Sequence, residues 1–284
     1  MEPVLTICIS THNDSDFVLN TLLCLEKITK NNFKVIIRDN DSDLGHAEYL
    51  RKNTKKYKNV YLYRVENLNL NGSMAHGTSL NDLYNKINTR YGAIIDADFT
   101  FLHKNWDEIL INELDEKCPI IGTQGPSFKY QDFPYVFALF FYTDIFKKLN
   151  IDLRPGDVFN DATQDTGFRV RENYLARGYK GKLLVNKYTG DYKSGPFRNI
   201  NCQEFYLKGY DNIFASHFWR GSSYGAWKYF VKYRKMINRA PIIGKSLLKL
   251  TLLNKALYKI ARFKGKFDKK KWLKICRKIV NDIE

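Results

Sequence analysis

Apolar runs and amphipathic stripes alternate along the first hundred residues of the chain. Four short apolar runs bounded by polar residues are typical of buried strands: Val4–Ser10, Phe33–Ile37, Val60–Val65 and Tyr91–Ile95. Between them, apolar side chains recur at helical spacing and predict helices over 17–28, 44–57 and 74–87. Strands that alternate with helices in this way predict an α/β fold, with a mostly parallel central sheet flanked by helices.

The rest of the chain carries further patterns. An amphipathic helix is expected over 168–175, ended by Gly178, and Ile213–Trp219 is an apolar, strand-like run. The tail has helical stripes over 227–237, 247–260 and 272–283. Pro241 and Gly244 are expected to separate the first of these stripes from the second, and Gly265 is expected to interrupt the helical pattern again.

Asp96-Ala97-Asp98 directly follows the apolar run Tyr91–Ile95. Two carboxylates at the end of a buried strand are unfavourable unless a positive group binds them. Mg²⁺ or Mn²⁺ carried with a diphosphate meets that need, because these cations take carboxylate and phosphate oxygens as ligands. The carboxyl ends of strands are also where α/β sheets bind ligands. The motif predicts a divalent-cation site, with an acidic loop that binds no metal as the alternative.

Three other segments accompany this motif in a fixed order. Ser10-Thr11-His12-Asn13 ends the first strand, Asp39-Asn40-Asp41-Ser42 follows the second, and Asn71-Gly72-Ser73 with Ala75-His76-Gly77 opens a helix. Together with Asp96-Ala97-Asp98, this set resembles the family-2 glycosyltransferases of GT-A fold over residues 3 to about 185, and more loosely to about 225. The resemblance implies a Rossmann-like catalytic domain over 1–225, with a nucleotide-sugar half at about 1–100 and an acceptor half at about 101–225.

The resemblance also implies a nucleotide-diphospho-sugar donor and a divalent metal, Mn²⁺ or Mg²⁺. Thr11 and Asn13 would line the nucleotide pocket, and Asp39 would accept hydrogen bonds from the base or ribose. Asn71, Gly72 and His76 would lie on the donor side. Asp96 would face the ribose or bridge to the metal through water, while Asp98 would bind the metal on the diphosphate. For Asp39, a turn that caps the next helix is an alternative that can coexist with binding.

Gln164-Asp165 stands where the family has Glu-Asp, ahead of a helix with an Arg, here Arg169, and then Gly178-Tyr179. The Glu is absent and the Asp is kept. In inverting members this Asp is the general base that deprotonates the acceptor hydroxyl, so the resemblance implies that role for Asp165. Asp161 is the competing candidate, and a helix cap or a salt bridge is the alternative role for Asp165.

His217 lies in the strand-like run Ile213–Trp219. Many metal-dependent GT-A enzymes supply a late His to the cation, and the resemblance implies this role for His217. A packed, hydrogen-bonded histidine beside Trp219 is the alternative.

The charge of the chain is concentrated in the tail. Of the net +16, residues 226–284 carry 18 Lys and Arg against 3 Asp and Glu, which leaves 28 against 27 for the first 225 residues. This basic, amphipathic helical extension predicts either peripheral contact with an anionic membrane or packing of the apolar faces on the catalytic domain. No nucleic-acid module is recognisable, so nucleic acid is not expected as a partner.

The expected activity is transfer of a sugar to a hydroxyl of a glycan or lipid-linked acceptor in surface polysaccharide synthesis, with inversion. The alternatives are a retaining GT-A transferase, or a non-catalytic glycan- or membrane-binding protein on a transferase scaffold. No Gly-x-Gly-x-x-Gly is present, and Gly244-Lys245-Ser246 lacks the first glycine of a P-loop. The five cysteines are scattered and odd in number, which favours the cytoplasm. The basic tail adds the expectation of a peripheral location on the inner face of the membrane.

Overall fold

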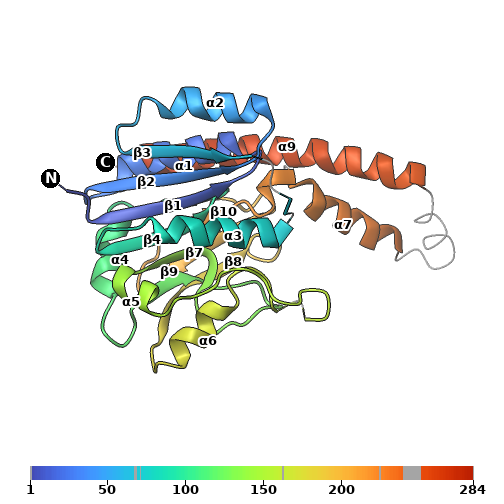
Figure 1. The fold of residues 1–284 in the computed structure, drawn as a ribbon. Helices are drawn as coiled ribbons and strands as arrows, with labels where there is room; N and C mark the ends of the chain where they lie inside the picture. Colours follow the sequence, from blue (N-terminus) through green and yellow to red (C-terminus); the bar gives the residue numbers. More distant parts are fainter. Residues whose placement is uncertain are drawn as a thin grey trace.

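The computed structural model describes residues 2–66, 69–70, 72–161, 163–223, 225–238 and 251–283, and Figure 1 shows a mixed sheet with helices on its two faces. The strands are β1 Leu5–Thr11, β2 Phe33–Asn40, β3 Val60–Val65, β4 Tyr91–Asp96, β5 Phe99–Phe101, β6 Ile120–Thr123, β7 Tyr135–Tyr142, β8 Gly181–Tyr188, β9 Gln203–Leu207 and β10 Ala215–His217. The helices are α1 Ser15–Ile28, α2 Leu44–Thr54, α3 Gly72–Asn85, α4 Trp106–Glu113, α5 Thr143–Lys148, α6 Arg169–Leu175, the short 3₁₀ turn η1 Gly221–Ser223, α7 Ala226–Asn238 and α9 Thr251–Asn281.

The strands form one sheet in the order β3-β2-β1-β4-β7-β6-β8-β9-β10-β5. The four strands β3, β2, β1 and β4 are parallel, as the alternation of strands and helices predicts. Beyond β4 the pairings are antiparallel except for β6 with β8, so the sheet is mixed rather than mostly parallel. The α/β class is confirmed, and the antiparallel half arises because strands such as β6 and β7 follow one another without a crossover helix.

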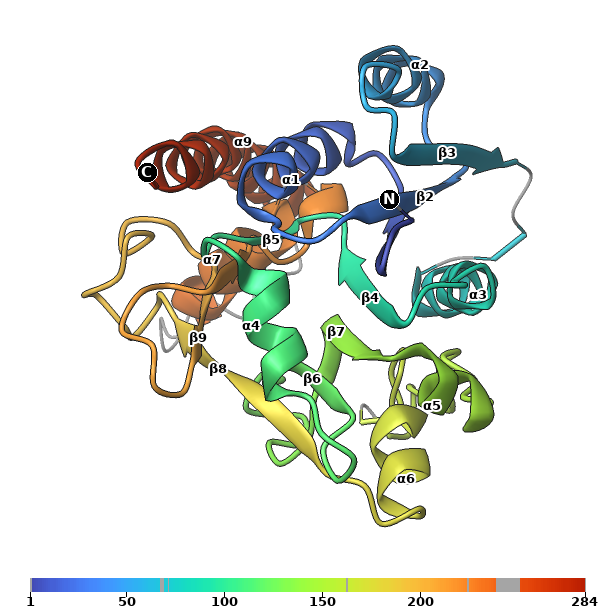
Figure 2. The ribbon, with the colours of Figure 1, turned by 90° about the vertical axis from the view of Figure 1, so that its left-hand side faces the viewer.

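The two faces of the sheet are covered by different helices. Helices α1 and α9 lie side by side on one face, and α3 lies on the other (Figure 2). The alternation along β1 explains this, because Ile7 and Ile9 join the core cluster under α1, while Cys8 joins the cluster under α3. A strand that is buried on both faces reads as a continuous apolar run, and all of β1 is buried.

The parallel register brings the ends of three strands to one edge of the sheet. Thr11 pairs with Asp39 across β1 and β2, and Ser10 pairs with Asp96 across β1 and β4. The loops that follow these strands therefore meet beside the same edge, which is the place where open α/β sheets bind ligands.

The tail contains a long helix that packs on the core. The sequence pattern predicts an interruption at Gly265, but α9 runs without a break from Thr251 to Asn281, so that prediction is wrong. A glycine inside a helix costs only about 1 kcal/mol relative to alanine. Packing outweighs this cost, because Gly265 is buried and Trp272, further along the same helix, enters the main core cluster. The expected break at Pro241 and Gly244 lies outside the described residues.

Among the residues that the structure describes, no helix is both long enough and apolar enough to cross a bilayer.

Candidate active site

Asp96, Asp98 and His217 come together at the end of β4. His217 Nε2 lies 3.0 Å from Asp98 Oδ1 and 3.5 Å from Asp96 Oδ2. One ligand atom from each residue can be chosen so that all lie within 4.8 Å of one another. Asp96 is the last residue of β4, and Asp98 lies between β4 and β5. Strand β10 brings His217 to them because it pairs with β5, with His217 opposite Phe99.

Neighbouring groups fix the orientation of these side chains. The backbone amide of Gly221 donates to Asp98 Oδ2 at 2.8 Å. Gln203 Oε1 lies 3.0 Å from His217 Nδ1, and the two residues face each other across the β9–β10 pair. With Nδ1–H donating to Gln203, Nε2 is directed at the aspartates, where it hydrogen-bonds to Asp98 Oδ1. A metal ligand needs the same orientation of the ring.

The two carboxylates have opposite pKa shifts. Burial raises the pKa of Asp96 to about 6, with Asp98 and Asp165 adding to the effect and His76 and His217 opposing it. Burial alone would also raise the pKa of Asp98, but His217 and the Gly221 amide outweigh it and hold that pKa below its usual range. For His217, burial is outweighed by Asp98, so its pKa is raised. A cation bound here would compete with a proton for these groups.

The residues present fit a divalent cation. Two carboxylates and one imidazole form a mixed oxygen and nitrogen donor set, which suits Mn²⁺ better than Mg²⁺. Asp96 Oδ1 is buried and has no hydrogen-bond partner, although His76 Nε2 on α3 lies 3.4 Å from it. A buried carboxylate oxygen of this kind is able to take a cation as its partner.

The residues expected around the nucleotide gather at the neighbouring strand ends. Thr11 is buried, and its hydroxyl has no hydrogen-bond partner. Asp39 is also buried, accepts the backbone amide of Ser42 at 3.1 Å and lies 3.6 Å from Arg64 Nη1. Asn13 Oδ1 accepts the backbone amide of Asp43 at 2.8 Å, which joins the loops after β1 and β2.

The third predicted segment lies at the start of α3. Gly72 is the first residue of that helix, with φ +56°, and His76 is one turn further along beside Asp96. Asn71 lies outside the described residues. Thr166 Oγ1 donates to the carbonyl of Ser73 at 3.1 Å, so this segment also contacts the loop that carries Asp165.

Asp165 and Asp161 occupy different environments. Asp165 Oδ2 lies 3.7 Å from the ammonium of the buried Lys129, and Asp165 is close enough to Asp96 and Arg220 to shift the pKa values of both. Asp161 instead binds the amide and hydroxyl of Thr163 at 2.8 and 2.6 Å, and these hydrogen bonds lower its pKa. A depressed pKa and a local capping role are unfavourable features for a general base at Asp161. Gln164 Oε1 accepts the amide of Asp157 at 3.0 Å and shapes the same loop.

A strained turn covers the cluster from the tail side. Trp219 and Arg220 both have positive φ, 66° and 61°, and the turn is held by the Gly221 amide on Asp98. Behind it, the buried Lys228 donates to the carbonyl oxygens of Phe218, at 2.6 Å, and Asn201. Burial lowers the pKa of Lys228 to about 8.

Asp14 and Gln203 belong to the site but are not revealed by the sequence pattern. Asp14 is buried with one carboxylate oxygen unpartnered, and burial, together with Asp98 and Asp96, holds its pKa well above the usual range. It follows Asn13 in a turn whose sequence also fits a helix cap, so the sequence alone gives no reason to assign Asp14 to the site. Gln203 stands in an ordinary strand, and only the pairing of β9 with β10 shows its contact with His217.

The comparison with protein families gives one match. Residues 6–174 match the model described as glycosyl transferase family 2. This span contains the strand ends, Asp96 and Asp98 and the Asp165 loop, and it stops before His217. Among curated proteins, none matches the chain significantly.

Several solved structures resemble this chain. The mannosyltransferase PcManGT from Pyrobaculum calidifontis, in complex with GDP-Man and Mn²⁺, has 13% identity and a TM-score of 0.50, and the match covers 93% of this chain and 74% of that one. TarS 1-349 of S. aureus has 14% identity and a TM-score of 0.46, with 64% of this chain and 57% of that one covered. The bifunctional enzyme WbbM has 10% identity and a TM-score of 0.46, with 88% and 52% covered.

The first of these likenesses shows the fold alone, because the identity is low. The family match covers more than half of the 284 residues. The chain has the GT-A fold and belongs to glycosyl transferase family 2.

Proposed function

We propose that the protein transfers a sugar from a nucleotide-diphospho-sugar to a hydroxyl of a glycan or lipid-linked acceptor in surface polysaccharide synthesis, with metal dependence and inversion. The observation that carries this proposal is the cluster of Asp96, Asp98 and His217 at the carboxyl end of β4 in a family-2 chain. The neighbour PcManGT, whose complex contains GDP-Man and Mn²⁺, supports the donor class and the cation.

The donor and the cation would share this edge of the sheet. Asp98 and His217 would hold the cation, with Asp96 beside it directly or through water. When bound, the cation neutralises charge that builds on the departing nucleoside diphosphate. Thr11, Asn13 and Asp39 would bind the nucleoside, with Asn71, Gly72 and His76 on the other side of the donor.

Asp165 would act as the base on the acceptor side. The acceptor oxygen attacks the anomeric carbon, the bond from that carbon to the diphosphate breaks, and the hydroxyl proton passes to the Asp165 carboxylate. Lys129 holds Asp165 in place at 3.7 Å, and Thr166 ties the loop to α3. Attack from the face opposite the leaving group inverts the anomeric configuration. A retaining transfer or a non-catalytic scaffold would leave this base without a role.

The test uses the conservative variant Asp98→Asn. Asparagine keeps the side-chain shape and an acceptor for the Gly221 amide, but it removes a charged metal ligand. Nucleotide binding in the presence of Mn²⁺ should fall by about tenfold or more, and excess EDTA should reduce wild-type binding to the same level. Asp144→Asn, at an exposed helix position, is the matched control. Full transfer activity in excess EDTA would exclude a catalytic cation.

The tail would place the enzyme at an anionic membrane. The first half of α9 has a row of exposed apolar side chains, Leu252, Ile260, Phe263 and Phe267, which are 82, 56, 76 and 48% exposed. Their spacing puts them on one helical face, flanked by exposed basic residues such as Lys259 and Arg262. This half of α9 lies beside α7, beyond the edge of the sheet (Figure 1).

A further inference from the structure

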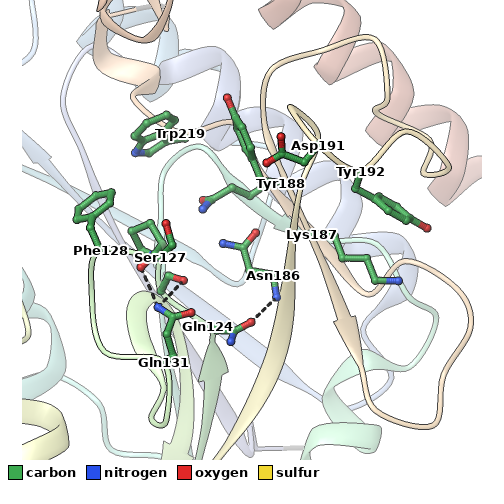
Figure 3. Close-up of a pocket in the computed structure, with 13 residues that line it drawn as sticks. Gln124, Ser127, Phe128, Gln131, Asn186, Lys187, Tyr188, Asp191, Tyr192 and Trp219 are labelled. Carbon is green, nitrogen blue, oxygen red and sulfur yellow. Dashed lines mark hydrogen bonds between the residues drawn. The ribbon is translucent and has the colours of Figure 1, made fainter.

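A cavity of about 570 Å³ lies beside the cluster and is lined by residues of β8 and β9 and of the loop after β6. It reaches the cluster through Gln203, whose side chain lines the cavity and also contacts His217 at 3.0 Å. Figure 3 shows the rings of Trp219, Phe128 and Tyr188 around this cavity, with the side-chain amides of Gln124 and Asn186 below them. Phe128 is 63% exposed, so its ring is available to a ligand.

This lining suits a hydroxyl-rich ring. Aromatic faces pack against the C–H faces of sugars and polyols, and side-chain amides both donate to and accept from hydroxyl groups. The Asn186 side-chain oxygen is buried without a hydrogen-bond partner. The two charged residues of the lining, Lys187 and Asp191, have opposite signs, so this cavity has no preference for a charged ligand.

A second cavity, of about 350 Å³, continues from the first toward α7. The two cavities share the rings of Tyr188 and Trp219, so one ligand can extend through both. Lys228, Lys232 and Lys235 line the second cavity, at positions that share one face of α7. Among the described residues that line it, there is no Asp or Glu to balance them.

Three ammonium groups around one cavity favour an anion with several acceptor oxygens. A carboxylate or a phosphate would fit, but phosphate offers more oxygens and charge to three separate lysines. Lys228 is buried and already bonded to two carbonyl groups, so it contributes charge, while the exposed Lys232 and Lys235 supply donors at the cavity wall.

We propose that the acceptor is a phosphate-bearing glycan or polyol, whose sugar or polyol unit binds between Phe128 and Trp219 and whose phosphate binds Lys232 and Lys235. The inference rests on the proposed glycosyl transfer, because it names the acceptor class of that same site. The phosphate can come from a lipid carrier or from the repeating unit of a polymer, and both present the same group to α7.

The test measures binding by titration calorimetry with the full chain, without nucleotide or metal, at low salt. The probes are a short-chain prenyl diphosphate carrying N-acetylglucosamine, a water-soluble oligomer of glycerol phosphate, and a neutral oligosaccharide of N-acetylglucosamine. The first two should bind more tightly than the third. Preference for the prenyl probe identifies a lipid carrier, and preference for the oligomer identifies a polymer phosphate.

Two variants separately test the two cavities, which together form the proposed acceptor groove. Lys232→Gln/Lys235→Gln should weaken the binding of both phosphate probes by about tenfold or more, because charge-assisted hydrogen bonds are lost. Binding of the neutral probe should not change. Phe128→Ala should weaken all three probes. The matched control, Lys270→Gln/Lys271→Gln, removes the same charge from exposed positions of α9.

The inference is overturned if no probe binds, if the neutral probe binds as tightly as the phosphate probes, or if the Lys232/Lys235 variant behaves like its control. Nucleotide binding with Mn²⁺ is measured on the same preparations. Loss of that binding with intact probe binding would contradict the proposed transfer instead, so the two failures are distinguishable.

Discussion

At the scale of single residues, Asp165 carries the sharpest prediction. Asp165→Asn removes the proton acceptor with little change in shape, so the transfer rate should fall by about two to four orders of magnitude. Donor affinity should barely change, because Asp165 pairs with Lys129 and is not at the strand ends that would bind the nucleoside. Initial rates and nucleotide titrations on the purified variant measure both quantities.

Asp161→Asn is the matched control for this prediction. Asp161 is hydrogen-bonded to Thr163, so Asp161→Asn should leave the transfer rate nearly unchanged. If Asp161→Asn loses transfer activity while Asp165→Asn keeps the wild-type rate, the general base is Asp161 and not Asp165. NMR of the product gives an independent check, since a product that retains the donor's anomeric configuration would refute Asp165 as an inverting base.

Asp96 and Asp98 could be found in the sequence because they directly follow an apolar run, whereas His217 lies inside one and is indicated by the family resemblance. Strand ends are visible in the pattern, and buried carboxylates there demand a partner. Gln203 and Lys228 could not be found. Gln203 meets His217 only because β9 pairs with β10, and Lys228 of α7 donates to the carbonyl of Phe218, which follows His217. Such contacts depend on tertiary pairing that a single sequence does not contain.

At the scale of secondary structure, the second half of α9 behaves as part of the core. Trp272 is fully buried against Phe17 and Phe218, and its Nε1 donates to Ser216 Oγ at 2.9 Å. Trp272→Ala should lower the free energy of unfolding by about 3–5 kcal/mol. Trp227→Ala, at a 43% exposed position of α7, should cost far less. Equal denaturation midpoints for the two variants would show that α9 adds little stability.

Lys228 gives a prediction about pH. Its pKa is about 8 in the folded state because of burial, against 10.5 in the unfolded chain. Between pH 8 and pH 10.5 the unfolded chain binds more protons than the folded chain. This lysine therefore destabilises the fold at neutral pH, and the destabilisation decreases as pH rises from 8 toward 10.5.

Lys228→Met has no such titration. As pH rises from 8 to 10.5, the free energy of unfolding of the wild type should therefore increase by up to about 3 kcal/mol relative to that of the variant. Urea denaturation of both proteins at several pH values measures the difference. A difference that stays constant with pH would mean that Lys228 is not held at a depressed pKa.

Element boundaries show where sequence pattern is reliable. Helices α1, α2 and α3 and the first four strands lie within a few residues of the expected ranges, because each combines a clear period with polar boundaries. The pattern predicts neither the antiparallel half of the sheet nor the passage of α9 through Gly265. Both depend on which surfaces pack together, and that information is not local.

At the scale of the whole molecule, the proposed acceptor groove, α7 and α9 form a sequence of neighbouring surfaces. The aromatic cavity adjoins the cluster, the lysine cavity adjoins α7, and α7 packs on α9 through Phe230, Tyr229 and Ala261. An acceptor held by its phosphate at α7 would then have its sugar unit directed toward Asp165 and the cluster. The exposed apolar row of α9 lies on the same tail.

That arrangement predicts which part of the tail contacts a membrane. Burying an apolar side chain of this size is worth about 1.5–3 kcal/mol, and each Lys or Arg near an anionic surface adds on the order of 1 kcal/mol. Ile260→Ser/Phe263→Ser should therefore lose most binding to phosphatidylglycerol vesicles in a sedimentation assay at low salt. Leu44→Ser/Tyr61→Ser, which changes 70 and 58% exposed side chains of α2 and β3, should bind like the wild type. If the folded full chain does not bind anionic vesicles at low salt, the tail serves only to pack against the core, as Trp272 does.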